Sequence, residues 1–150
     1  MRRSTRSFLF PDINVWIALT YRRHIHYISA NNWLSSVPDE AALCFCRFTQ
    51  LGFLRLLTTP AVMGSQVCSQ AAAWKNYDHW VRQGNATWVD EPSSVEPIFR
   101  MLSSSPQAAP KDWADSYLAA FAQGAGFQLV TFDQALAQKS AGAILLKAYT

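Results

Sequence analysis

Three aspartates that are far apart in the chain each lie where a predicted strand ends or a predicted helix begins. Asp12 follows the apolar run at residues 8–10 and precedes a helical pattern, and Asp133 follows a second apolar run. Asp115 lies in the first turn of another predicted helix, where the positive end of the helix dipole favours an ionised carboxylate. Because ligands of parallel α/β sheets bind beyond the carboxyl ends of the strands, these acids form the candidate site.

The chemistry that such a group of acids can perform follows from their mutual repulsion. Grouped carboxylates take up protons unless a cation lies between them, and oxygen ligands suit Mg²⁺, or Mn²⁺, better than zinc. Such an ion can activate water and stabilise the charge that develops in phosphodiester cleavage, so the acids predict hydrolysis of a nucleic-acid backbone. Each acid also has a simpler interpretation: Asp12 as a helix cap, Asp115 as a complement to the dipole, Asp133 as part of a turn with Thr131.

The elements that must position these acids alternate between short apolar strands and helices. Strands are predicted at residues 8–10, 41–46, 86–89 and 127–131. Helices are predicted at residues 14–21, 24–34, 48–57, 66–83, 93–102 and 112–123. This alternation predicts an α/β domain with a parallel sheet and helices on both faces.

Composition limits the function classes without choosing among them. The 150 residues, half of them apolar, suit one domain with a real core, and the net charge of +3 tolerates an anionic partner without establishing one. The odd number of cysteines, three, argues against a disulfide framework. Arg2, Arg3 and Arg6 precede an apolar stretch as in a signal peptide, but Pro11 interrupts it, and no stretch is long enough to span a membrane. We therefore expect a cytoplasmic protein.

Four blocks of the sequence resemble, in order, the motifs of PIN domains and in particular those of VapC toxins. They are Phe10-Pro11-Asp12-Ile13-Asn14-Val15 for the D-x-N-V opening, residues 46–55 (C-R-F-T-Q-L-G-F-L-R) for the third-helix block, residues 113–120 (W-A-D-S-Y-L-A-A) for the D-A-Y-L-A-A helix, and residues 129–133 (L-V-T-F-D) for the L-V-T-x-D strand end. The resemblance implies a three-layer α/β/α PIN-like domain that occupies residues 1–150 and contains a short parallel sheet of four or five strands.

The same resemblance implies a function and a set of partners. The chain would be the toxin of a type II toxin–antitoxin system, an Mg²⁺-dependent endoribonuclease that cleaves tRNA or rRNA through metal-activated water. Its partners would be the RNA, a VapB-like antitoxin and a second copy in a homodimer, with no membrane. Asp12, Asp115 and Asp133 would be the catalytic, metal-binding acids, with Asn14 and Thr131 as polar neighbours that orient ligands or water.

Gln50 departs from the family pattern, because many PIN nucleases carry glutamate at this point of the third helix. An amide offers one neutral oxygen but no charge and no basic group, so we expect weaker metal binding. The alternative function is therefore a catalytically weakened PIN-like module that binds RNA or an antitoxin.

Three further polar residues have two interpretations each. Arg55 lies in an otherwise apolar helix, either in a buried ion pair or as a phosphate contact. His26, which with His24 follows the first helix, has a structural or an RNA-proximal role, because residues two apart do not share a helical face. Asp112 is expected to be the N-cap of the helix at 112–123, or else to join the acids.

Overall fold

Five parallel strands form one sheet in the order β3-β2-β1-β4-β5 in the computed structural model, which describes residues 7–148. The strands are β1 (Phe8–Pro11), β2 (Ala42–Phe45), β3 (Ala86–Trp88), β4 (Gln128–Thr131) and β5 (Ile144–Leu145). The parallel sheet is confirmed, and its fifth strand had not been located from the sequence. Arg2, Arg3 and Arg6 lie outside the described residues.

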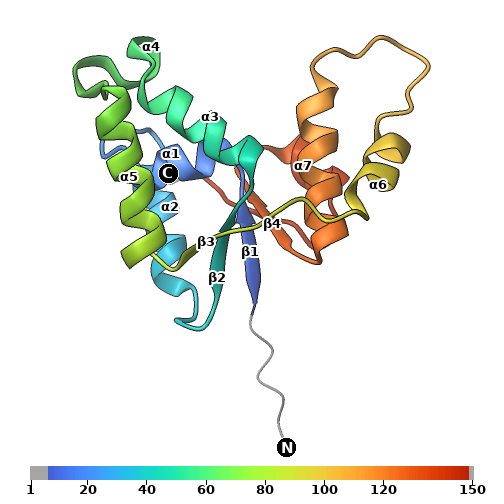
Figure 1. Cartoon of the computed structure of the whole chain (residues 1–150), viewed down its shortest axis with the longest axis horizontal. Helices are drawn as coiled ribbons and strands as arrows, with labels where there is room; N and C mark the ends of the chain where they lie inside the picture. The colour runs from blue at the N-terminus through green and yellow to red at the C-terminus, as the bar shows by residue number, and fades with distance from the viewer. Residues whose placement is uncertain (1–6, 149–150) are drawn as a thin grey trace, which may run out of the picture.

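Helices cover both faces of the sheet, which confirms the three-layer α/β/α class (Figure 1). They are α1 (Ile13–Thr20), α2 (Tyr27–Ser36), α3 (Arg47–Leu57), α4 (Pro60–Met63), the 3-10 turn η1 (Gly64–Gln66), α5 (Gln70–Gln83), α6 (Val95–Leu102), α7 (Asp112–Ala125) and α8 (Gln134–Lys139). Helices α1 to α5 pack on one face, and α6, α7 and α8 pack on the other. None of the helices in residues 7–148 has both the length and the apolar character needed to cross a membrane.

Side chains that alternate along the strands divide the core between the two faces. Leu43 and Phe45 of β2 point to the α1–α5 side, and Cys44 between them points to the α6–α8 side. The Trp16 ring of α1 stacks on Phe45 with their centroids 3.9 Å apart. Burial of aromatic side chains of this size contributes about 1.5–3 kcal/mol each, so the core holds α1, and Asp12 at its start, firmly against the sheet.

Three helices begin later than their sequence patterns predict, and one of them, α6, begins at Val95 instead of residue 93. The helix expected from residue 24 begins at Tyr27, and Ile25, which had been assigned to it, is 85% exposed. The helix expected from residue 66 begins at Gln70, because the Ser69 hydroxyl accepts a hydrogen bond from the Ala72 N–H and caps it.

Candidate active site

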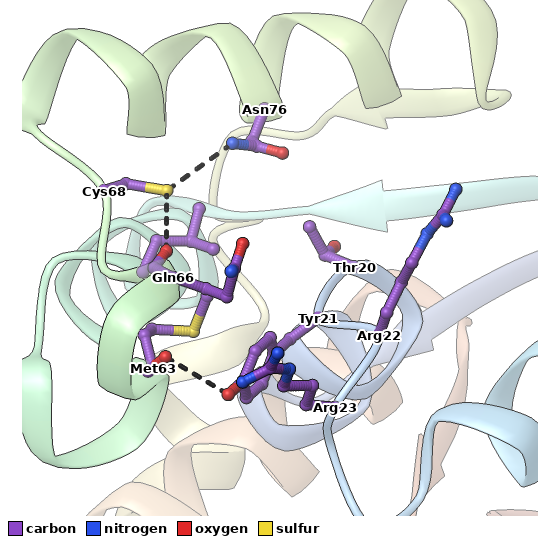
Figure 2. A pocket seen from close by; sticks show the side chains of 9 residues that line it. Thr20, Tyr21, Arg22, Arg23, Met63, Gln66, Cys68 and Asn76 are labelled. Atoms are coloured by element: carbon purple, nitrogen blue, oxygen red, sulfur yellow. Dashed lines mark hydrogen bonds between the residues drawn. The ribbon is translucent and has the colours of Figure 1, made fainter.

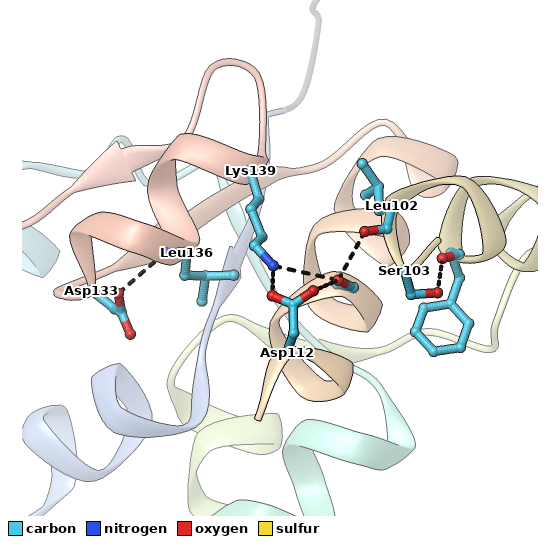
Figure 3. Close-up of polar contacts among 8 residues, drawn as sticks. Leu102, Ser103, Asp112, Asp133, Leu136 and Lys139 are labelled. Carbon is cyan, nitrogen blue, oxygen red and sulfur yellow. Dashed lines mark hydrogen bonds and ion pairs between the residues drawn. The ribbon is translucent and has the colours of Figure 1, made fainter. Parts of the chain in front are cut away.

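Asp12 and Asp133 occupy equivalent positions at the carboxyl ends of the neighbouring strands β1 and β4. Asp12 is the N-cap of α1, and its Oδ1 accepts the Val15 N–H at 3.0 Å. Asp133 is the N-cap of α8, and its Oδ1 accepts the Leu136 N–H at 3.1 Å (Figure 3). Both acids are therefore helix caps. The simpler interpretation predicted this for Asp12, whereas for Asp133 it predicted a turn with Thr131. The capping bonds also fix both acids at one edge of the sheet.

Thr131 connects the two acids. Its hydroxyl donates a short hydrogen bond to Asp12 Oδ2 and accepts the Asp133 backbone N–H at 2.9 Å. The threonine is fully buried, so these two bonds fix the orientation of its hydroxyl. Thr131 therefore orients the Asp12 carboxylate and holds the backbone of Asp133 beside it.

The acids influence one another electrostatically. Burial raises the pKa of Asp12 from 3.8 to about 6; hydrogen bonds from Thr131 and Val15 oppose this rise, and the negative charge of Asp133 adds to it. Burial, and then the charge of Asp133, also raise the pKa of Asp115. Asp133 thus lies within electrostatic range of both other acids.

The arrangement is not a ready-made metal cage. Within residues 7–148, no three histidine, cysteine or acidic side chains are grouped closely enough to hold a metal ion. Asp12 uses both carboxylate oxygens and Asp133 uses Oδ1 in the hydrogen bonds described above. Mg²⁺ typically takes only one or two carboxylates and completes its shell with water and substrate phosphate, so the donor set suits this ion.

Asp115 lies in the first turn of α7. It lines a depression of about 460 Å³ together with Pro110, Lys111 and Asp112 at the start of α7. Asn14 is exposed on the first turn of α1, and a hydrogen bond from its backbone N–H lowers the pKa of Asp12. The backbone rather than the side chain of Asn14 thus contacts the acid.

Gln50 is buried, and its amide is engaged on the side of the sheet away from β4. Arg47 Nη1 donates to Gln50 Oε1, and the same side chain makes a hydrogen bond with the Tyr77 hydroxyl of α5. These contacts direct the amide toward α5 and β3, the far strand of the sheet. Gln50 therefore lies in the predicted helix, and its side chain forms hydrogen bonds with Arg47 and Tyr77.

Asp112 is not the N-cap of α7, so that prediction is wrong. The N-cap is Lys111, which makes no side-chain cap, and Asp112 is the first helical residue. Its carboxylate pairs with Lys139 of α8 and accepts the Ser116 hydroxyl at 3.1 Å (Figure 3). A cation from a distant part of the chain outweighs the local capping bond because a charged partner makes the stronger hydrogen bond.

Arg55 and His26 also have defined positions. Arg55 is exposed in the last turn of α3 and forms no ion pair within residues 7–148, so the buried ion pair is wrong. The His26 ring stacks on Phe132 at 4.3 Å between centroids, and the His26 backbone N–H donates to His24 Nδ1. His26 thus packs beside the strand end that carries Asp133, and its proximity to RNA stays a prediction.

A cavity at the end of α1 does not coincide with the acids. Its volume is about 410 Å³, and its walls include Tyr21, Arg22, Arg23 and Met63 (Figure 2). The Tyr21 hydroxyl donates to the Met63 carbonyl at 3.1 Å and closes one wall. Tyr21, Arg22 and Arg23 follow the last turn of α1. The helix is roughly 12 Å long, so they lie about that far from Asp12 at its start.

Two residues with defined roles at this side of the molecule, Arg47 and Lys139, were not singled out from the sequence. The Arg47 guanidinium lies over the Trp88 ring, 4.4 Å from its centroid, and Lys139 holds Asp112 as described. Arg47 belongs to the third-helix block, but its contact with Trp88 depends on β3 lying next to β2. No spacing in the sequence carries that information.

Comparisons with known proteins agree on one family. The PIN domain family matches residues 9–142. Ribonuclease VapC41 of Mycobacterium tuberculosis is 37% identical over 134 residues, which cover 87% of this chain and 92% of that protein. The crystal structure of VapBC2 from Rickettsia felis bound to a promoter DNA fragment superposes with a TM-score of 0.64 at 11% identity, over 92% of this chain and 96% of that chain. Mycobacterium tuberculosis VapC20, described as a sarcin-ricin loop cleaving toxin, gives a TM-score of 0.62 at 14% identity, over 87% and 93% of the two chains.

Proposed function

Because this chain belongs to the PIN domain family, we propose that it is an Mg²⁺-dependent endoribonuclease, the toxin of a type II toxin–antitoxin pair. The observation that carries the proposal is the position of Asp12, which is 5% exposed, bound by Thr131 and exposed to the charge of Asp133. A buried carboxylate beside a second negative charge is costly unless a cation accompanies it. The relatives that are named ribonucleases support an RNA substrate.

Each residue of the proposed site has a role that follows from its position. Asp12 and Asp133 would hold the ion, which supplies an activated water and stabilises the developing negative charge when it is bound. Thr131 fixes the orientation of Asp12 through its hydroxyl. Asp115, which lines the depression at the start of α7, would be the third acid that holds the ion.

The substrate and partners belong to the same proposal. A tRNA or an rRNA loop is the RNA to test first, because a relative of the same fold is described as cleaving the sarcin-ricin loop. A VapB-like antitoxin would neutralise the toxin, since one structural neighbour is a VapBC complex. The homodimer and the cytoplasmic location are proposed with it.

The decisive experiment uses the purified chain, free of antitoxin, and total RNA from its own host. We expect cleavage that requires Mg²⁺ or Mn²⁺, stops in EDTA and is lost in Asp12→Asn and Asp115→Asn. A matched control is Asp39→Asn, because Asp39 is exposed and precedes β2 at the opposite edge of the sheet. Cleavage that continued in EDTA or in Asp12→Asn would refute the metal-dependent mechanism.

A binding module remains the second candidate function, and one observation favours it. The Gln50 amide contacts Arg47 and Tyr77, so α3 adds no carboxylate to the acids. Weak metal binding would then leave RNA or antitoxin binding as the main activity. RNA binding by the wild type without cleavage of any host RNA at high Mg²⁺ would establish this alternative.

A further inference from the structure

Arg47 and Trp88 form a cation–aromatic pair at the carboxyl edge of the sheet, separate from the acids. Arg47 is the first residue of α3, directly after the end of β2, and Trp88 is the last residue of β3. The guanidinium carbon lies 4.4 Å from the centroid of the indole ring. The indole N–H donates to Asp90 Oδ1 at 3.1 Å, so the ring that supports the arginine is itself fixed.

Gln50 holds the same guanidinium from a second direction. Its buried Oε1 accepts a hydrogen bond from Arg47 Nη1, and the Tyr77 hydroxyl holds the amide in turn. An amide orients the arginine without cancelling its charge, and no carboxylate pairs with Arg47 in the part of the chain that the structure describes. The arginine is exposed, so its remaining N–H groups face solvent.

We propose that Arg47, oriented by Gln50 and Trp88, binds a backbone phosphate of the RNA strand next to the acidic site. This inference rests on the proposed function, since it assigns a substrate contact to the same edge of the sheet. A guanidinium presents a planar fork of donors that matches the oxygens of a phosphate. Limiting its motion in advance reduces the conformational entropy that is lost when the phosphate binds.

The order of the strands places Arg47 at a distance from the acids that a single RNA strand can span. The strand before Arg47, β2, is the direct neighbour of β1, which leads to Asp12, and β3 lies one strand beyond. Neighbouring strands are about 4.8 Å apart, so the Trp88 end of the edge lies on the order of 10 Å from the Asp12 strand. A strand of RNA that crosses the edge can therefore reach the acids with one phosphate and Arg47 with another.

This assignment gives Gln50 a physical role of its own, namely to orient Arg47. If Gln50 were only a lost metal ligand, it would have no such role. A glutamate at position 50 would form a part-buried ion pair with Arg47 and leave less of its positive charge available to RNA. The neutral amide orients the arginine and leaves its positive charge unpaired. The identity of residue 50 would thus affect substrate binding before it affects the metal.

The test measures binding of a short fluorescein-labelled single-stranded RNA of mixed sequence by anisotropy, in EDTA so that hydrolysis does not interfere. Arg47→Gln should weaken binding about tenfold at low salt, as expected for a charge-assisted hydrogen bond, and should reduce the slope of log K against log salt by about 0.7. The control is Arg82→Gln, which removes the same charge from the end of α5, at the opposite edge of the sheet. Equal binding by wild type and Arg47→Gln, or an equal loss in Arg82→Gln, would overturn the proposal.

Gln50→Glu provides the second, independent arm. It should weaken RNA binding in EDTA by a similar factor while Arg47→Lys, which keeps the charge but loses the planar stack, gives an intermediate loss. Stronger RNA binding in Gln50→Glu would refute the role of the neutral amide. Failure of the proposed function would look different, because the wild type would then bind RNA with this arginine dependence and yet never cleave it with Mg²⁺.

Discussion

Replacing Asp12 with asparagine should make the metal-free protein more stable at neutral pH, although it removes an acid on which the proposed cleavage depends. The carboxyl group is 5% exposed, and its pKa is raised from 3.8 to about 6, mainly by burial. A pKa that is raised in the folded state means that the fold favours the neutral form. The stability that this preference contributes is present below the unfolded pKa and is lost as the pH rises through about 6.

The magnitude follows from the size of the shift. At about 1.4 kcal/mol per pKa unit, the change from 3.8 to about 6 lowers the free energy of unfolding by about 3 kcal/mol once the carboxylate is ionised. Asparagine is as good an N-cap as aspartate, and its amide can donate to the Thr131 hydroxyl oxygen. Because the strong bond from Thr131 to the carboxylate is lost, we expect a net gain of about 1–3 kcal/mol near pH 7.

Urea unfolding in EDTA tests this expectation. The advantage of Asp12→Asn over the wild type should be present near pH 7 and shrink to about 0.5 kcal/mol near pH 4, where the folded carboxyl is protonated. Asp39→Asn, an exposed control, should change stability by less than about 0.5 kcal/mol. Mg²⁺ should then stabilise the wild type but not the variant. An Asp12→Asn protein less stable than the wild type near pH 7 in EDTA would refute the reasoning.

Three further substitutions test contacts around the site. Thr131→Val removes the donor to Asp12 and should raise its pKa further, which moves the acidic limb of the pH profile of kcat/KM upward by about one unit; an unmoved limb would contradict the bridge. Gly52→Ala places a Cβ 2.1 Å from Ile13 Cδ1 and should cost about 1–3 kcal/mol in urea unfolding, with partial rescue by the added change Ile13→Ala. Lys139→Met breaks the part-exposed ion pair between α8 and α7 and should cost about 0.5–1 kcal/mol, a loss that high salt diminishes.

The fold was predictable where an element is long or strongly apolar. The first four strands lie within two residues of their predicted bounds, and β2, an apolar run buried along its whole length, has the clearest pattern. The strand β5 has two residues, neither fully buried, and the helix α8 has six. Both are too short to show a hydrophobic periodicity in the sequence. Pro60 correctly predicted the end of the third helix, since α3 ends at Leu57. Proline also suits the first turn of a helix, and Pro60 starts the short helix α4, which was not predicted.

The candidate site was predictable only in the parts that strand ends determine. Asp12 and Asp133 follow β1 and β4, so the rule for parallel sheets places them together without further information. The direction of Gln50 depends on the rotation of α3 about its axis, and the contact of Arg47 depends on which strand lies beside β2. These are tertiary facts, and no local pattern of residues specifies them.

The charges at this edge of the sheet are those that the proposed phosphodiester substrate requires. The charge of Asp133 raises the pKa of Asp12 and of Asp115, which is the repulsion that the proposed cation would relieve. The positive charge of the arginine after β2 is unpaired, because its buried partner is an amide. A phosphate next to a cation at the acids, with a second phosphate at the arginine, satisfies both ends of the edge at once. In that proposal, a carboxylate at position 50 would pair with the arginine and leave this end of the edge without an unpaired positive charge to attract RNA.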